Sequence, residues 1–237
     1  MEPPALDDLI LAPLLPPPDD GALELLHTRN YEVQVFKASP TEMVARGAVR
    51  DLKPGGLYLP DDPAPLPVHH MLVELRIDFP SLTITRATVE FRVYPEDPCP
   101  SIVAHYESLA GLSIARGFTH KVRELFGGPR GCTHTTALLQ AMAPAVVQST
   151  YSMRVIESRD SGRSPRLTAP PIPKDLPPEV RRKLYGFNLN TCHMWAEDGD
   201  FVAALDRGET PGTPVFIKLR LRERGKDPQA WRRPSGS

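Results

Sequence analysis

The sequence predicts an α+β fold, in which an antiparallel sheet of about four strands is followed by three helices packed on one face. Two observations predict it. Apolar and polar residues alternate with a period of two through the first half of the chain, and from Pro100 onward the apolar residues recur at helical spacing. Strands that all precede the helices are typical of this class, because folds with a parallel sheet interleave the two kinds of element.

Strict alternation indicates the strands. Residues 31–35 and 43–49 each alternate, and a Lys-Ala-Ser-Pro turn separates them. The clearest pattern runs over residues 71–79 and resumes over residues 87–93 after a Pro-Ser turn. Alternating runs joined by short turns are typical of antiparallel hairpins.

Apolar residues at helical spacing predict the helices. The first covers residues 102–109 and ends at Gly111, and the second covers residues 118–126 and ends at a Gly-Gly pair. The third and longest covers residues 138–151 and contains Pro144, which should kink or divide it.

Composition predicts extensions at both ends of this core, since six of the 28 prolines lie in residues 1–30 and six more in residues 159–178. The expected parts are an extended proline-rich arm (residues 1–30), the α+β core (31–158), a proline-rich linker (159–178), and a C-terminal extension that packs on the core and ends in a basic tail (179–237). Within the extension, residues 201–203 and 215–221 are expected as late strands.

Charge and hydropathy exclude some partners. The 237 residues carry 28 basic and 29 acidic side chains, for a formal net charge of −1, so no global field attracts nucleic acid or an anionic membrane. The chain has neither the pattern of a signal peptide nor a membrane-length apolar run. With only three cysteines, these features lead us to expect a cytoplasmic protein with reduced thiols.

The densest chemical signal is the run Gly-Gly-Pro-Arg-Gly-Cys-Thr-His, which ends in Cys132, Thr133 and His134. Its glycines permit a tight turn, and a thiol at the start of a helix lies in the positive end of the helix dipole, which favours thiolate. Cys132 and His134 are two residues apart and could share one ion. The alternative, given equal weight, is a small buried cysteine beside a histidine that caps the helix.

Further residues extend this candidate site. His69 shares strand parity with inward-facing Met71 and could complete the site, although a core histidine bonded to a backbone carbonyl is an alternative of equal weight. Cys99 follows the second hairpin. Thiolates and imidazoles suit a transition metal such as zinc or iron. The candidate metal ligands are therefore His69, Cys99, Cys132 and His134. The candidates for contacts around the ligands or to a substrate are Gly131, Thr133, Cys192 and His193.

The motifs His69-x-Met71, Pro95-x-x-x-Cys99 and Gly127-Gly128-x-x-Gly131-Cys132-Thr133-His134 together resemble a bacterial family of unknown function. The chain departs from that pattern at two places. It has His70 where the family has Asp, and it has Thr-Thr-Ala at residues 135–137 where the family has Leu followed by a Glu. The order of strands, helices and cysteines is also distantly similar to iron–sulfur scaffold proteins of the IscU kind. Neither resemblance implies an activity.

Three functions remain open. The first is a metal-dependent enzyme that acts on a small molecule and uses the ion to polarise a carbonyl or activate water. The second is a metal-free enzyme or binding protein in which Cys132 and His134 contact a small-molecule ligand. The third is a scaffold or interaction protein that carries a metal or a cluster. No nucleic-acid or membrane partner is expected, and the oligomeric state stays open.

Overall fold

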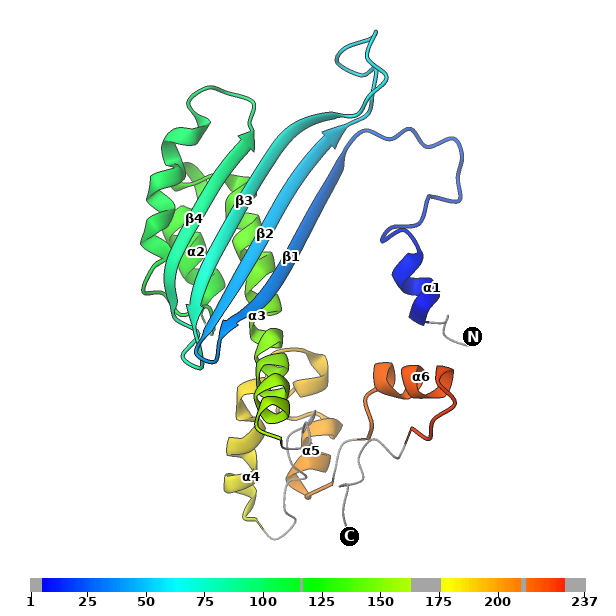
Figure 1. Ribbon diagram of the computed structural model, residues 1–237, viewed down its shortest axis with the longest axis vertical. Helices are drawn as coiled ribbons and strands as arrows, with labels where there is room; N and C mark the ends of the chain where they lie inside the picture. Colours follow the sequence, from blue (N-terminus) through cyan, green and yellow to red (C-terminus); the bar gives the residue numbers. More distant parts are fainter. Residues whose placement is uncertain (1–5, 116, 163–175, 210–211, 229–237) are drawn as a thin grey trace. The chain divides into compact units, whose positions relative to one another are not determined.

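The structure is a computed structural model that describes residues 6–115, 117–162, 176–209 and 212–228 (Figure 1). The chain forms two compact units, one made by residues 22–163 and the other by residues 1–21 and 164–237. Most of the expected linker lies outside the described residues. None of the described helices is long and apolar enough to cross a membrane.

The first unit is built on a four-stranded antiparallel sheet whose spatial order follows the chain. Its strands are β1 (Thr28–Ser39), β2 (Glu42–Lys53), β3 (Leu66–Asp78) and β4 (Ile84–Val93). Consecutive strands pair as neighbours, as expected for alternating runs joined by short connections. The α+β prediction is confirmed. However, β1 begins inside the segment predicted as the proline-rich arm, so Arg29 belongs to the sheet.

Helical segments then cover one face of this sheet. They are η1 (Cys99–Leu109), α2 (Phe118–Phe126), η2 (Gly128–Arg130) and α3 (Thr133–Asp160). Figure 1 shows α2 and α3 on the same side of the strands. The first predicted helix is a 3₁₀ helix. The third continues as one α-helix through Pro144, so of the two predicted outcomes, a kink or a division, the helix is not divided.

The core of this unit lies between the sheet and α3. Alternate residues of β2 and β3 are almost completely buried, and Leu138, Leu139 and Met142 of α3 are fully buried against them. Gly47 marks the closest approach, because a Cβ atom at this position would lie 2.7 Å from Sδ of Met142. The absence of a side chain at Gly47 therefore lets α3 lie directly on β2.

The second unit is helical. It contains α1 (Leu6–Leu11), α4 (Pro178–Tyr185), η3 (Gly186–Asn188), η4 (His193–Trp195), α5 (Asp200–Asp206) and α6 (Val215–Glu223). Its small apolar core consists of Tyr185, Val202 and Leu205, with partly buried neighbours.

Two predictions for this unit are wrong. The expected late strands are helices α5 and α6, and in α5 the buried residues Val202 and Leu205 are three apart, which is helical spacing. The N-terminal arm is not extended throughout, because α1 forms within it and Asp7 of this helix is paired with Arg220 of α6 at 2.7 Å.

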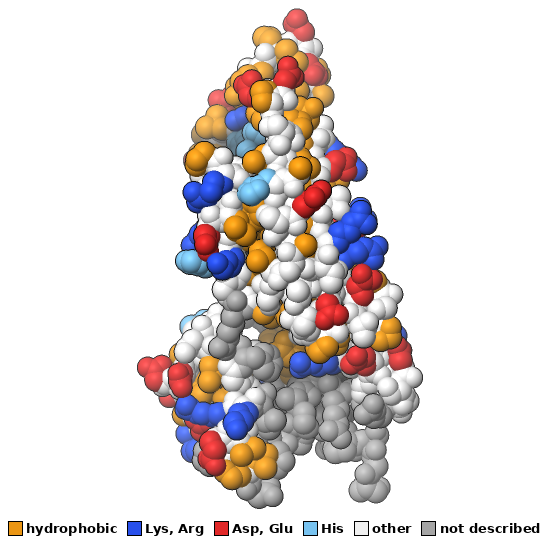
Figure 2. Space-filling view, turned by 90° about the vertical axis from the view of Figure 1, so that its left-hand side faces the viewer, with side chains coloured by type: hydrophobic (Ala, Val, Ile, Leu, Met, Phe, Trp, Pro, Cys, Tyr) orange, Lys and Arg blue, Asp and Glu red, His pale blue; other side chains and the backbone are white. Residues whose placement is uncertain are grey.

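Figure 2 shows that Lys and Arg side chains are interspersed with Asp and Glu side chains on the face drawn there.

Candidate metal centre

Three polar side chains form a row across the sheet. Arg29 of β1 pairs with Asp51 of β2, which in turn pairs with His69 of β3. Asp51 shares the strand parity of buried Ala45 and Val49, so its carboxylate points toward the helices, and its side chain is only 1% exposed. The prediction that His69 faces inward is confirmed, since His69 reaches the same carboxylate.

The fourth side chain comes from the start of α3. Cys132 is the N-cap residue, although its side chain makes no capping hydrogen bond, and His134 is the second residue of the helix. The turn before it requires glycine, because a Cβ atom at Gly131 would lie 2.6 Å from the carbonyl oxygen of Phe126. The backbone N–H of Cys132 donates to the hydroxyl of buried Tyr106 at 2.7 Å. These constraints fix where α3 begins, and therefore where His134 lies.

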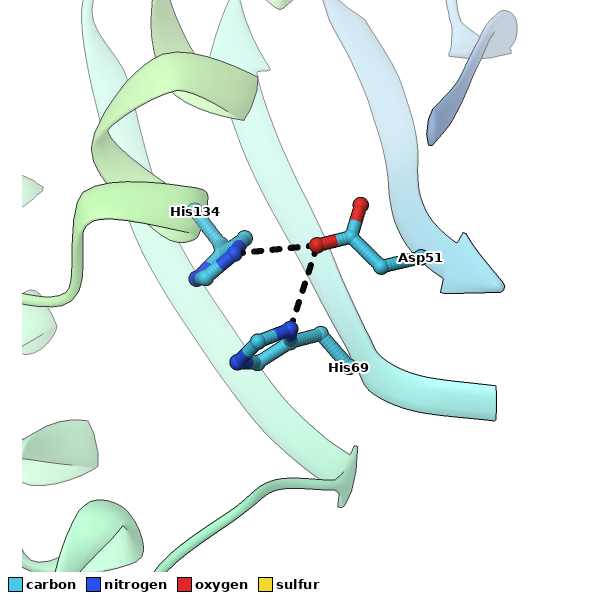
Figure 3. A group of neighbouring side chains, drawn as sticks. All are labelled: Asp51, His69 and His134. Atoms are coloured by element: carbon cyan, nitrogen blue, oxygen red, sulfur yellow. Dashed lines mark hydrogen bonds and ion pairs between the residues drawn. The ribbon is translucent and has the colours of Figure 1, made fainter. Parts of the chain in front are cut away.

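Both histidines meet one oxygen of Asp51. Oδ2 lies 3.1 Å from Nδ1 of His69 and 3.1 Å from Nε2 of His134 (Figure 3). The two imidazole rings are stacked, with centroids 3.8 Å apart and an interplanar angle of 27°. Figure 3 shows the other ring nitrogens, Nε2 of His69 and Nδ1 of His134, on the side away from the carboxylate. The arrangement therefore joins residues from β2, β3 and α3 around a single atom.

Arg29 holds the carboxylate from its other side. Its guanidinium donates from Nε to Oδ1 and from Nη2 to Oδ2 of Asp51, both at 2.7 Å. Nε2 of His27 lies 3.5 Å from Oδ1. Such a two-point contact fixes the plane of the carboxylate as well as its position. Oδ2 is therefore held in the orientation that faces the two rings.

Electrostatics fix the charge states at neutral pH. Burial raises the pKa of Asp51, but the Arg29 guanidinium outweighs burial, and with weaker effects from His134 and His27 it lowers the pKa of Asp51 to about 2. The same pair raises the pKa of Arg29. Burial lowers the pKa of His134, and His69 and Arg29 lower it further. At neutral pH Asp51 is thus an anion and His134 is a neutral imidazole.

The three residues have the spacing of metal ligands. One donor atom each from Asp51, His69 and His134 lies within 4.8 Å of the others, and this is the one such group of three or more found among the described residues. Two ligands bound to an ion at about 2.1 Å lie about 3.0 Å apart at an octahedral angle of about 90° and about 3.4 Å apart at the tetrahedral angle of about 109°. Both nitrogen–oxygen distances therefore match adjacent positions around one ion.

Comparison with known proteins places this site in a family. Residues 27–148 match the family described as protein of unknown function (DUF2889). The chain belongs to the DUF2889 family. The matched segment contains all of the residues around the carboxylate, from His27 to His134. No curated protein and no solved structure matches the chain.

The DUF2889 domain brings together only part of the predicted ligand set. His69 and His134 meet, and Cys132 lies beside them with Sγ 3.8 Å from Nδ1 of His134. Cys132 and Cys99 are both outside the three-residue group, and Cys99 lies at the start of η1. All three cysteines are free thiols.

The other predicted residues are not among the three side chains that meet at the DUF2889 site. Gly131 forms the turn before α3, and Thr133 is exposed at its first position. Cys192 and His193 lie at the start of η4 in the other unit, outside the segment that matches the family.

Asp51 and Arg29 are the functional residues that sequence reasoning missed. The signal for Asp51 was present, because it continues the inward parity of Met43, Ala45 and Val49 and places a charge on an apolar strand face. No comparable pattern in the sequence indicated Arg29. It lies in the segment assigned to the proline-rich arm, and only the register of β1 with β2 places it opposite Asp51.

Proposed function

We propose that this DUF2889 protein binds one divalent transition-metal ion through Asp51, His69 and His134 and uses it to act on a small molecule. The observation that supports the proposal is the placement of both histidine nitrogens 3.1 Å from Oδ2 of a carboxylate that is 1% exposed. Three donors from three separate elements converge there. Arg29 already balances the charge of Asp51, so the support for a metal is the convergence of the three donors itself and not an unpaired charge.

The donor set favours zinc or ferrous iron. Two imidazoles and one carboxylate are the ligands of one class of zinc hydrolases, and also of the oxygenases that use non-haem iron. Magnesium and calcium prefer sets made of oxygen alone. The two histidines therefore argue for a transition metal.

The partial exposure of the two histidines supports access for a substrate. The side chains of His69 and His134 are 20% and 16% exposed, whereas Asp51 is closed off from solvent. Three protein ligands leave at least one coordination position for water or a substrate oxygen. A divalent ion together with Arg29 would exceed the single negative charge of Asp51, and this excess of positive charge suits a carbonyl oxygen or a bound hydroxide.

Elemental analysis of the purified full chain tests the proposal. We expect about one zinc or iron per chain in the wild type, and at least a tenfold lower content in Asp51→Asn and His134→Ala. The matched control is His120→Ala, since His120 is 83% exposed and its ring lies 4.0 Å from the carboxylate of exposed Glu124. A folded wild type that contains no transition metal, and takes up none when zinc or ferrous iron is supplied, would overturn the proposal.

A metal-free role is the second candidate, and one contact favours it. Sγ of Cys132 lies 3.8 Å from Nδ1 of His134, so both groups could contact a ligand at the start of α3. In that case the elemental analysis finds nothing, and Cys132→Ala abolishes ligand binding. Iron accompanied by acid-labile sulfide would instead support the cluster-carrying scaffold.

A further inference from the structure

The ring of His134 has a partner at each of its two nitrogens. Nε2 faces Oδ2 of Asp51 at 3.1 Å, and Nδ1 faces Sγ of Cys132 at 3.8 Å. A neutral imidazole carries one hydrogen, so one nitrogen donates while the other accepts. The partners therefore determine which tautomer is present.

Without a metal, Asp51 sets the tautomer. Its ionised carboxylate has no hydrogen to donate, and a lone pair on Nε2 of His134 would be repelled by the anionic Oδ2 at 3.1 Å, so Nε2 carries the ring hydrogen. Nδ1 then keeps its lone pair, and the thiol of Cys132 donates to it.

We infer that binding of the proposed metal at Nε2 of His134 moves the ring hydrogen to Nδ1 and reverses the hydrogen bond with Cys132. This inference rests on the proposed function, because it requires the ion to take the place of the Nε2 hydrogen. One hydrogen leaves Nε2 and one is gained at Nδ1, so the ring remains neutral and releases no net proton. Sγ of Cys132 changes from donor to acceptor and remains a thiol.

Cys132 thereby becomes a positioning residue for the metal-binding histidine. A metal-bound histidine usually donates its other N–H to an acceptor, which fixes the orientation of the ring. The backbone of Cys132 is well held for this task, because its N–H donates to Tyr106 and its carbonyl accepts from the N–H of Thr136 at 2.9 Å. Its side chain is only partly buried, so the thiol hydrogen has room to turn away from the ring.

Histidine NMR on the full chain tests the reversal, since ring nitrogen and carbon shifts distinguish the two tautomers. The His134 signals are assigned by their loss in His134→Gln. We expect the Nε2–H tautomer in the metal-free protein and the Nδ1–H tautomer with saturating zinc, both at one neutral pH. Zinc uptake with the Nε2–H tautomer retained would overturn the reversal alone, whereas no zinc uptake by the wild type would overturn the proposed function and the reversal with it.

Zinc affinity gives a second readout. Cys132→Ala removes the acceptor and should weaken zinc binding about tenfold, and Cys132→Ser, which keeps an acceptor, should recover much of the loss. The matched control is Cys192→Ala, because Cys192 is an exposed thiol outside the family segment. Equal zinc affinity in wild type and Cys132→Ala would contradict the positioning role.

Discussion

Oδ2 of the buried carboxylate of Asp51 lies 3.1 Å from Nε2 of His134, so β2 contacts the first turn of α3 through these two side chains. Because the carboxylate is also held by Arg29 and His69, the contact links β1, β2, β3 and α3. The candidate site therefore also contributes to the stability of the fold.

Asp51→Asn should destabilise the metal-free protein. The amide cannot satisfy Arg29 and both histidines together, so buried donors lose their acceptor, at a cost of about 1–3 kcal/mol. Urea unfolding in the presence of a chelator measures the change. The control is Glu74→Gln, which removes an exposed carboxylate 3.6 Å from Arg46 and should change stability by less than about 0.5 kcal/mol. Equal stabilities of the two variants would contradict the structural role of Asp51.

The same carboxylate predicts a dependence of stability on pH. The pKa of Asp51 is lowered to about 2 from its ordinary value of 3.8, so ionisation favours the folded state. This contribution is fully present above pH 3.8 and is lost as the pH falls toward 2. The difference in unfolding free energy between wild type and Asp51→Asn should thus shrink as the pH falls below about 4. A difference that grows on acidification would refute this explanation.

Gly47→Ala tests the close packing of α3 on β2. The new methyl group would lie 2.7 Å from Sδ of Met142, near the far end of a flexible side chain, so we expect a loss of about 1–2 kcal/mol. Thermal or urea unfolding measures it. Gly21→Ala is the control, because nothing lies within 4 Å of a Cβ atom there. A neutral Gly47→Ala would mean that α3 lies farther from the sheet.

Pro144→Ala should stabilise the protein. Pro144 is exposed in the middle of the continuous helix α3, where it has no N–H to donate and has a poor helix propensity. Replacement by alanine should add about 1–3 kcal/mol to the free energy of unfolding, measured by urea titration. A helix divided at this residue would gain nothing, so an unchanged stability would argue against a continuous α3.

Local patterns predicted most of the core fold. The alternation of residues 71–79 and the glycines after Phe126 have local physical causes, and the elements they indicate are present. The strand predicted over residues 215–221 is a helix, because a short apolar run fits both the strand period of two and the helical period of about 3.6. Pro214, immediately before the run, suits the start of a helix. For the site, parity placed His69 inward and the Gly-Cys-Thr-His turn placed His134 at a helix start. The contact of both with Asp51 depends on strand register and on the position of α3, which no local pattern contains.

Zinc titration of the metal-stripped full chain by calorimetry tests the central claim most directly. The account predicts about one zinc per chain in the wild type and in His120→Ala, and binding at least tenfold weaker in Asp51→Asn, His69→Ala and His134→Ala. Zinc binding of equal strength in all five proteins, or no binding by a folded wild type, would contradict it.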